Sequence, residues 1–257
     1  MNGVIMLGAY GGRLNDKSTT SLLVSDSVAI DAGNLLSPLG DSARDINHIF
    51  LTHSHIDHIV DLPFMIDAFF TSRDRSLNIY GPPQTIQTLK SNIFNDLIWP
   101  DFTKIALLRS GEAAITMNEI QPNVCYEIDG VKLTPFETNH TVKSVGYVIE
   151  KESKKIMFTS DTGKCANIWN ILNDDPDIAS IIIEVSFPSN YEKLALESGH
   201  LTPKLLNEEL ANLKREDVAI YINHIKPDFI DRLKRELIAY ERTRKAIPLS
   251  DGALILL

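Results

Sequence analysis

Residues 53–58 read His-Ser-His-Ile-Asp-His, so three histidines and an aspartate stand within six positions. An apolar run typical of a buried β-strand comes directly before them. Successive side chains of an extended segment point to opposite faces, so we expect His53 and His55 on one face. A turn after them can direct Asp57 and His58 towards a second ion. Neutral imidazoles and carboxylates at this density indicate a site for zinc, manganese or iron.

The spacing His-x-His-x-Asp-His resembles the metallo-β-lactamase superfamily of metallohydrolases. Further segments occur in the order that the family has them: a Gly-rich opening at 7–12, Ile-Asp-Ala-Gly at 30–33, His140, Ser-Asp-Thr-Gly at 160–163 and Asn-His at 223–224. The resemblance spans most of the chain. It implies an α/β fold, a four-layer αββα sandwich of two similar halves, formed by residues 1–257 as a single domain.

By position, the resemblance implies two divalent metal ions and seven ligands. One ion would be held by His53, His55 and His140, the other by Asp57, His58 and His224, with Asp161 bridging the two. Taken alone, His140 would be read as a loop histidine, Asp161 as a turn residue and His224 as a core histidine. The ordered set favours the ligand interpretation for all three. A histidine-rich set favours zinc, with manganese or iron as alternatives.

Two segments resemble the phosphodiesterase branch of the superfamily, in which a glutamate orients a non-ligand histidine near the phosphate. They are Glu-Val-Ser-Phe at 184–187 and Gly-His-Leu-Thr at 199–202. The resemblance implies catalytic roles for His200, Glu184 and Asp57, with His200 assisting the leaving oxygen, which is typically worth about 10²–10⁴ in rate. The attacking group would be a metal-bridging hydroxide. A solvated carboxylate at a strand end is the alternative interpretation of Glu184.

Residues 93–102, 185–187 and 221–227 narrow the resemblance to class II 3′,5′-cyclic-nucleotide phosphodiesterases. The implied reaction is hydrolysis of cyclic AMP, cyclic GMP or another small phosphodiester, by a protein that forms a homodimer. Trp99 and Phe102, on a proline-interrupted segment, can stack on a purine or form an aromatic plug under a loop. Asp61 departs from the class pattern, which has a small residue there, and this change can alter substrate or metal preference.

Ribonuclease Z shares the metal pattern and the Glu/His pair, and a di-iron protein that binds or senses oxygen shares the fold. Ribonuclease Z needs a basic arm to hold transfer RNA, but no Gly- and Lys-rich insertion separates the segments here, and the formal net charge is −9. An iron site would favour more carboxylates. A thioester or lactam hydrolase would leave Glu184 and His200 without a purpose. A small phosphodiester is therefore the expected partner, and a long nucleic acid is not.

Composition predicts a globular chain, since 257 residues with 44% hydrophobic content can bury a full core. There is no basic-then-apolar leader and no apolar run long enough to cross a bilayer, so a cytoplasmic location and no membrane partner are expected. Cys125 and Cys165 are expected to be buried thiols. No Gly-Lys-Ser/Thr follows Gly8, Gly11 and Gly12, so they predict a tight turn near the site rather than a phosphate cradle.

The elements that must position these residues follow from apolar periodicity and from turn residues. Strands are predicted at 4–7, 21–24, 28–30, 48–51, 77–80, 131–136, 146–150, 155–158, 181–184, 218–222 and 252–257. Helices are predicted at 59–70, 84–94 and 228–242, and after Thr202, which is a good N-cap before Pro203. His48 belongs to no motif, so we expect it to be structural.

Overall fold

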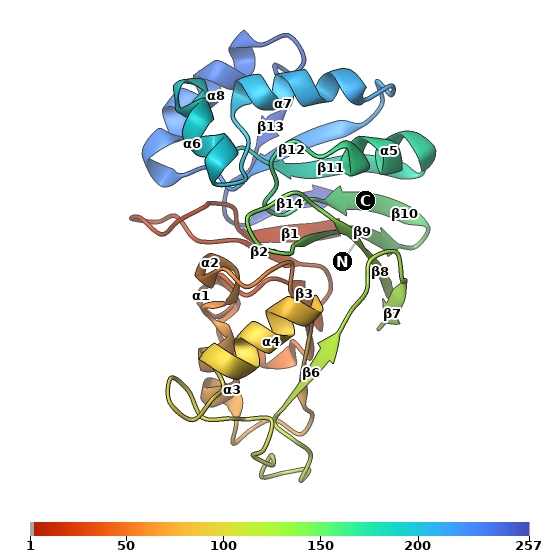
Figure 1. Cartoon of the computed structure of the whole chain (residues 1–257). Helices are drawn as coiled ribbons and strands as arrows, with labels where there is room; N and C mark the ends of the chain where they lie inside the picture. The colour runs from red at the N-terminus through yellow and green to blue at the C-terminus, as the bar shows by residue number, and fades with distance from the viewer. Residues whose placement is uncertain (1–2, 257) are drawn as a thin grey trace.

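The computed structural model describes residues 3–256 and arranges them in four layers (Figure 1). One outer layer contains α1 (Leu36–Leu39), α2 (Ile56–Ile59), α3 (Leu62–Phe69) and α4 (Pro83–Asn92). The other contains α5 (Ala166–Asp174), α6 (Glu192–Glu197), α7 (Pro203–Glu209) and α8 (Ile230–Ala239). Two sheets lie between these layers. The expected αββα sandwich is therefore confirmed.

The first sheet has seven strands, in the order β14 (Ala253–Leu256), β1 (Gly3–Gly8), β2 (Ser21–Leu23), β3 (Val28–Ile30), β4 (His48–Phe50), β5 (Leu77–Gly81) and β6 (Ile115–Glu119). The second has the order β7 (Tyr126–Ile128), β8 (Val131–Glu137), β9 (Val145–Lys151), β10 (Lys154–Phe158), β11 (Ile178–Glu184), β12 (Ala219–Asn223) and β13 (Ile247–Pro248). In each sheet, the first four strands pair antiparallel and the last four pair parallel. The two sheets thus have the same pattern of strand pairing, in agreement with the expected sandwich of two similar halves.

The central strands β2, β3 and β4 of the first sheet are buried on both faces, which explains why they are apolar without alternation. In β3, Val28 and Ile30 face the core between the sheets, whereas Ala29 faces the core under α3 and α4. In β4, Phe50 belongs to the inter-sheet core and Ile49 to the outer one. The loops that carry the motifs therefore begin at strands that are buried on both faces.

The predicted strands are confirmed to within a few residues, although Leu257 of the last one lies outside the described residues. The helix predicted at 59–70 is confirmed as α3, but it begins three residues later, because a break at 60–61 separates it from the short helix α2, which was not predicted. Ala32 causes the break, because its N–H donates to the His58 carbonyl (2.7 Å) and its own carbonyl accepts from Asp61 N (2.8 Å). After β3, Ala32 thus forms hydrogen bonds with the α2 segment instead of pairing with another strand, and these bonds hold α2 at the end of β3.

The last helix is shorter than the predicted 228–242, because α8 ends at Ala239 and Tyr240 is extended. Thr202 caps α7 as predicted, with its hydroxyl accepting from Leu205 N at 3.2 Å. Helix α5 and strands β6 and β7 were not predicted. Over residues 3–256, none of the helices has both the length and the apolar character needed to cross a membrane.

Candidate metal centre

The predicted ligands meet where loops leave the carboxyl ends of strands in both halves. His53 and His55 follow β4, and Asp57 and His58 lie on α2, which begins immediately after His55. From the second half come the residues of the loops after β8, β10 and β12. These are His140, Asp161 and His224.

The first group able to hold a metal ion consists of His53, His55, His140 and Asp161. His53 Nε2 and His140 Nε2 each lie 3.9 Å from Asp161 Oδ2. His140 Nε2 is 3.2 Å from His55 Nδ1. These ligand atoms all lie within 4.8 Å of one another, close enough to hold one ion.

The second group consists of Asp57, His58 and His224. Asp57 Oδ2 lies 3.3 Å from His224 Nε2 and 4.0 Å from His58 Nε2. Asp161 borders this group too, since its Oδ2 is 3.4 Å from His58 Nε2 and its Oδ1 is 3.2 Å from His224 Nε2. The structure thus places Asp161 between the two groups.

The donor atoms fit metal ions better than they fit one another. Within residues 3–256, His53 Nε2 and His58 Nε2 are buried and have no hydrogen-bond partner, an arrangement that costs free energy unless something else satisfies them. Burial lowers the pKa of His53 well below its usual value, which keeps the ring neutral. Burial alone would raise the pKa of Asp161, but the neighbouring His224 and His58 hold it well below its usual value. Neutral imidazole and ionised carboxylate are the forms that bind metal, so His53 and Asp161 are ready to do so. Burial tends to lower the pKa of His58, but Asp161 and Asp31 outweigh it and raise the pKa, so His58 must release a proton when it binds metal.

Three imidazoles are oriented from their far side, because each Nδ1–H has an acceptor. His58 Nδ1 donates to Asp31 Oδ2 (2.7 Å) and His140 Nδ1 to the Gly199 carbonyl (2.9 Å). His224 Nδ1 donates to the Ser186 hydroxyl (2.9 Å). This pattern assigns the tautomer that leaves each Nε2 free for a metal ion.

Asp31 is a functional residue whose role the sequence did not reveal. Its carboxylate is fully buried and also accepts from Thr52 N (2.9 Å) and from the Thr52 hydroxyl. The Thr52 hydroxyl oxygen in turn lies 3.0 Å from His53 Nδ1. One carboxylate thus supports a histidine of each group. An acidic residue closing an apolar strand was the available signal.

His200 and Glu184 form a buried pair beside the two groups. Glu184 Oε1 accepts from His200 Nδ1 at 2.5 Å, and Oε2 accepts from the Ser186 hydroxyl (3.0 Å) and from Leu201 N (3.3 Å). Glu184 is 0% exposed, so the interpretation of it as a solvated strand-end carboxylate is wrong. Burial tends to lower the pKa of His200, but Glu184 outweighs it and the pKa is raised. A His200 nitrogen also lies within 4.8 Å of donor atoms of Asp161 and His224.

A family model described as "Beta-lactamase superfamily domain" matches residues 27–225 of the chain. The chain belongs to the metallo-β-lactamase superfamily. It is 26% identical over 281 residues to a Yersinia pestis protein named probable 3′,5′-cyclic-nucleotide phosphodiesterase, covering 88% of this chain and 78% of the relative. It is 24% identical to a ribonuclease Z of Sulfurisphaera tokodaii, covering 96% of each chain. The crystal structure of unliganded yeast PDE1 shares the fold over the full length of both chains, with a TM-score of 0.82 and 19% identity.

Membership of the superfamily makes the chain a metal-dependent hydrolase, with His/Asp groups suited to divalent ions. The Gly-rich opening lies at this site, as predicted: a Cβ on Gly11 would stand 2.6 Å from the His224 ring. Asp31, Ser160 and His224 have positive φ of 60°, 56° and 60°. Such backbone is costly for these residues and marks strand ends shaped for the site.

The two aromatic residues considered for purine stacking pack against other aromatic rings. Phe102 is buried, with its ring 5.5 Å from that of Phe70, which supports the plug interpretation for Phe102. The Trp99 ring meets Phe64 of α3 edge-on at 5.3 Å. The Asp61 carboxylate caps the N-terminus of α1, because its Oδ2 accepts from Leu35 N (2.7 Å) and Leu36 N (3.0 Å).

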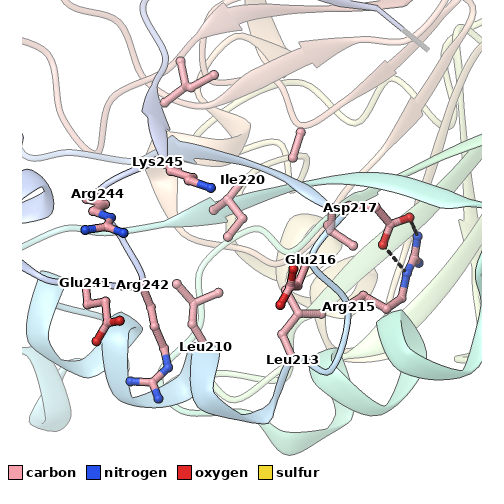
Figure 2. A pocket seen from close by; sticks show the side chains of 13 residues that line it. Leu210, Leu213, Arg215, Glu216, Asp217, Ile220, Glu241, Arg242, Arg244 and Lys245 are labelled. Atoms are coloured by element: carbon pink, nitrogen blue, oxygen red, sulfur yellow. Dashed lines mark hydrogen bonds and ion pairs between the residues drawn. The ribbon is translucent and has the colours of Figure 1, made fainter.

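A cavity of about 660 Å³ lies apart from the histidines, between the loop after α7 and the segment before β13 (Figure 2). Arg215 lines the cavity, but its guanidinium is bound to Asp217, with 2.7 Å between Nη2 and Oδ2. Its lining residues include Leu210, Ile220, Arg244 and Lys245. Its lining contains no histidine, so it is distinct from the candidate metal centre.

Proposed function

We propose that the chain hydrolyses 3′,5′-cyclic nucleotides, cyclic AMP or cyclic GMP, to 5′-nucleotides with the help of two zinc ions. The proposed ligands are His53, His55 and His140 for one ion, and Asp57, His58 and His224 for the other, with Asp161 shared. Imidazole and carboxylate donors suit zinc. When bound, a pair of divalent ions supplies Lewis acidity towards phosphoryl oxygens and lowers the pKa of water.

The observation that carries the proposal is the buried His200–Glu184 pair. Breaking a phosphodiester bond releases an alkoxide, which leaves readily only when it receives a proton. Glu184 fixes Nδ1–H of His200 and favours the imidazolium, so that Nε2–H can donate to the departing 3′-oxygen. A thioester hydrolase has less need of such a proton donor, because a thiolate is a much weaker base than an alkoxide and leaves without protonation.

The name of the Yersinia pestis relative supports a cyclic nucleotide as substrate. The direct test is to reconstitute the protein separately with zinc and with manganese and to identify the product of 3′,5′-cyclic AMP by chromatography. Metal-dependent formation of 5′-AMP is expected. If an aryl phosphodiester is cleaved but neither cyclic AMP nor cyclic GMP is, the substrate is another small phosphodiester. Metal-dependent oxygen uptake without phosphodiester cleavage would favour the di-iron alternative.

A ribonuclease Z activity is the second candidate, because the Sulfurisphaera tokodaii relative of that name aligns over 96% of each chain. The formal net charge of −9 opposes it, since transfer RNA must be held through its phosphates. The same protein should therefore leave a transfer RNA precursor with a 3′ trailer uncut under conditions in which it hydrolyses cyclic AMP. Faster cleavage of the precursor would replace the first proposal with the second.

A further inference from the structure

A row of three aromatic rings leads away from His200. The Phe187 ring lies 5.8 Å from the His200 ring, at an interplanar angle of 64°. Phe229 follows at 6.4 Å from Phe187, and Tyr191 at 5.4 Å from Phe229. We call Phe187, Phe229 and Tyr191 the aromatic row. It connects the buried proton donor to the surface.

The row comes from loops beside the site rather than from the core of a sheet. Phe187 follows Ser186, whose hydroxyl contacts both Glu184 and His224. Phe229 belongs to the 3₁₀ turn η4 (Pro227–Phe229), shortly after His224, and Tyr191 to the turn η2 (Ser189–Tyr191). The same segments therefore position the site and the row.

The three rings are only partly covered. Phe187 and Phe229 are half-buried, and Tyr191 is 39% exposed. By contrast, the phenylalanines between the sheets, such as Phe136 and Phe158, are 1% and 0% exposed. Partly exposed aromatic faces beside a site of charge chemistry are suited to stacking a flat, heteroaromatic group.

We propose that the aromatic row binds the base of the substrate nucleotide, an inference that rests on the proposed function. In the proposed reaction, a phosphate at the metal centre would have His200 on its leaving-group side, and the Phe187 ring lies 5.8 Å from the His200 ring. The 3′-oxygen leaves phosphorus on the side of His200, while the ribose stays bonded to phosphorus through its 5′-oxygen. The base attached to that ribose is therefore placed on the side of His200. The row thereby takes the role considered for Trp99 and Phe102 from the sequence.

The test compares two ligands that differ only in the base. Binding of 5′-AMP and of ribose 5-phosphate to the zinc-loaded protein is measured by calorimetry, for the wild type and for Phe187→Leu. Loss of one stacking ring should weaken 5′-AMP about tenfold and leave ribose 5-phosphate unchanged. Tyr191→Ala, at an exposed position that cannot disturb the core, should weaken 5′-AMP in the same selective manner by a smaller factor.

Phe70→Leu is the matched control, since Phe70 is also half-buried and pairs with another ring, that of Phe102, outside the row. The proposal would be overturned if Phe187→Leu weakened 5′-AMP and ribose 5-phosphate equally. It would also be overturned if Trp99→Leu, and not Phe187→Leu, lost the preference for 5′-AMP. A wild type that binds both ligands equally would overturn it as well. If base selectivity depends on Phe187 but cyclic nucleotides are not hydrolysed, the row stands and the reaction assigned to the site is wrong.

Discussion

Three histidines of the candidate metal centre are positioned by hydrogen bonds on the side of the ring that faces away from it. His58, His140 and His224 each direct Nε2 inward because Nδ1–H is held by Asp31, Gly199 or Ser186. Such outer contacts fix the ring and, where the acceptor is a carboxylate, increase its basicity. The acceptors should therefore influence metal affinity without touching the metal.

Asp31→Asn tests this at the most deeply buried acceptor. The amide keeps the shape of the side chain but removes the charge that supports His58, so zinc affinity should fall about 10–100-fold. Competition against a chromophoric chelator measures the change. Asp41→Asn, at an exposed aspartate far from the centre, is the control and should bind zinc as the wild type does. Unchanged affinity in Asp31→Asn would mean that the bond to His58 does not support the metal.

His200→Ala separates proton donation from metal binding. Turnover of cyclic AMP should fall about 10²–10⁴-fold, because the leaving oxygen loses its proton donor. Metal content, measured by atomic emission, should stay at the wild-type value. His48→Ala removes a half-buried histidine whose Nδ1 is 3.3 Å from the Tyr80 hydroxyl, and should change neither quantity. A parallel loss of metal in His200→Ala would show that His200 is a ligand or a structural residue.

At the scale of elements, the ends of strands carry the site. What could be predicted from the sequence was local: an apolar run followed by ligand-type residues, as in β4 and β12. The split between α2 and α3 could not be predicted, because it depends on hydrogen bonds from Ala32, which lies beyond β3. The hydrogen bond from His224 Nδ1 to the Ser186 hydroxyl likewise requires β11 and β12 to pair in a particular register.

The elements that were not predicted had weak local signals. Strand β6, Ile-Thr-Met-Asn-Glu, carries its polar residues on a half-covered edge. Helix α5 has no capping side chain at Cys165, although Ile168, Trp169 and Leu172 form a buried stripe. Their stability comes from packing against distant segments, and such packing overrides local propensity.

The Gly-rich turn between β1 and β2 offers a matched pair of substitutions. A Cβ at Gly11 would lie 2.6 Å from His224 Nδ1, whereas one at Gly12 would meet only the Pro227 ring, at 3.4 Å from Cδ. Gly11→Ala should therefore displace the imidazole and reduce bound zinc by about one equivalent, and Gly12→Ala should not. Metal analysis of the two purified variants gives the result. Equal zinc content in both would show that the turn can shift without moving His224.

At the scale of the whole molecule, two similar halves face each other and the metal centre joins them. His53, His55, Asp57 and His58 come from the first half, and the remaining proposed ligands come from the second. One large buried core is shared by residues of both halves and a second lies within the first half, so the fold does not depend on metal alone. Bound ions should nevertheless add stability, because they bind the folded chain and not the dispersed ligands of the unfolded one.

Removing the metal should therefore lower the melting temperature without unfolding the protein at room temperature. Free metal at 100 times its dissociation constant adds about 3 kcal/mol to the folded state, which corresponds to about 6–12 °C for a chain of this size. Thermal unfolding followed by circular dichroism, with and without a chelator, measures the shift. Asp161→Ala is the control, because the loss of the carboxylate between both groups should leave little metal to remove. A wild type that loses its metal yet melts at the same temperature would show that the ions serve chemistry without linking the halves.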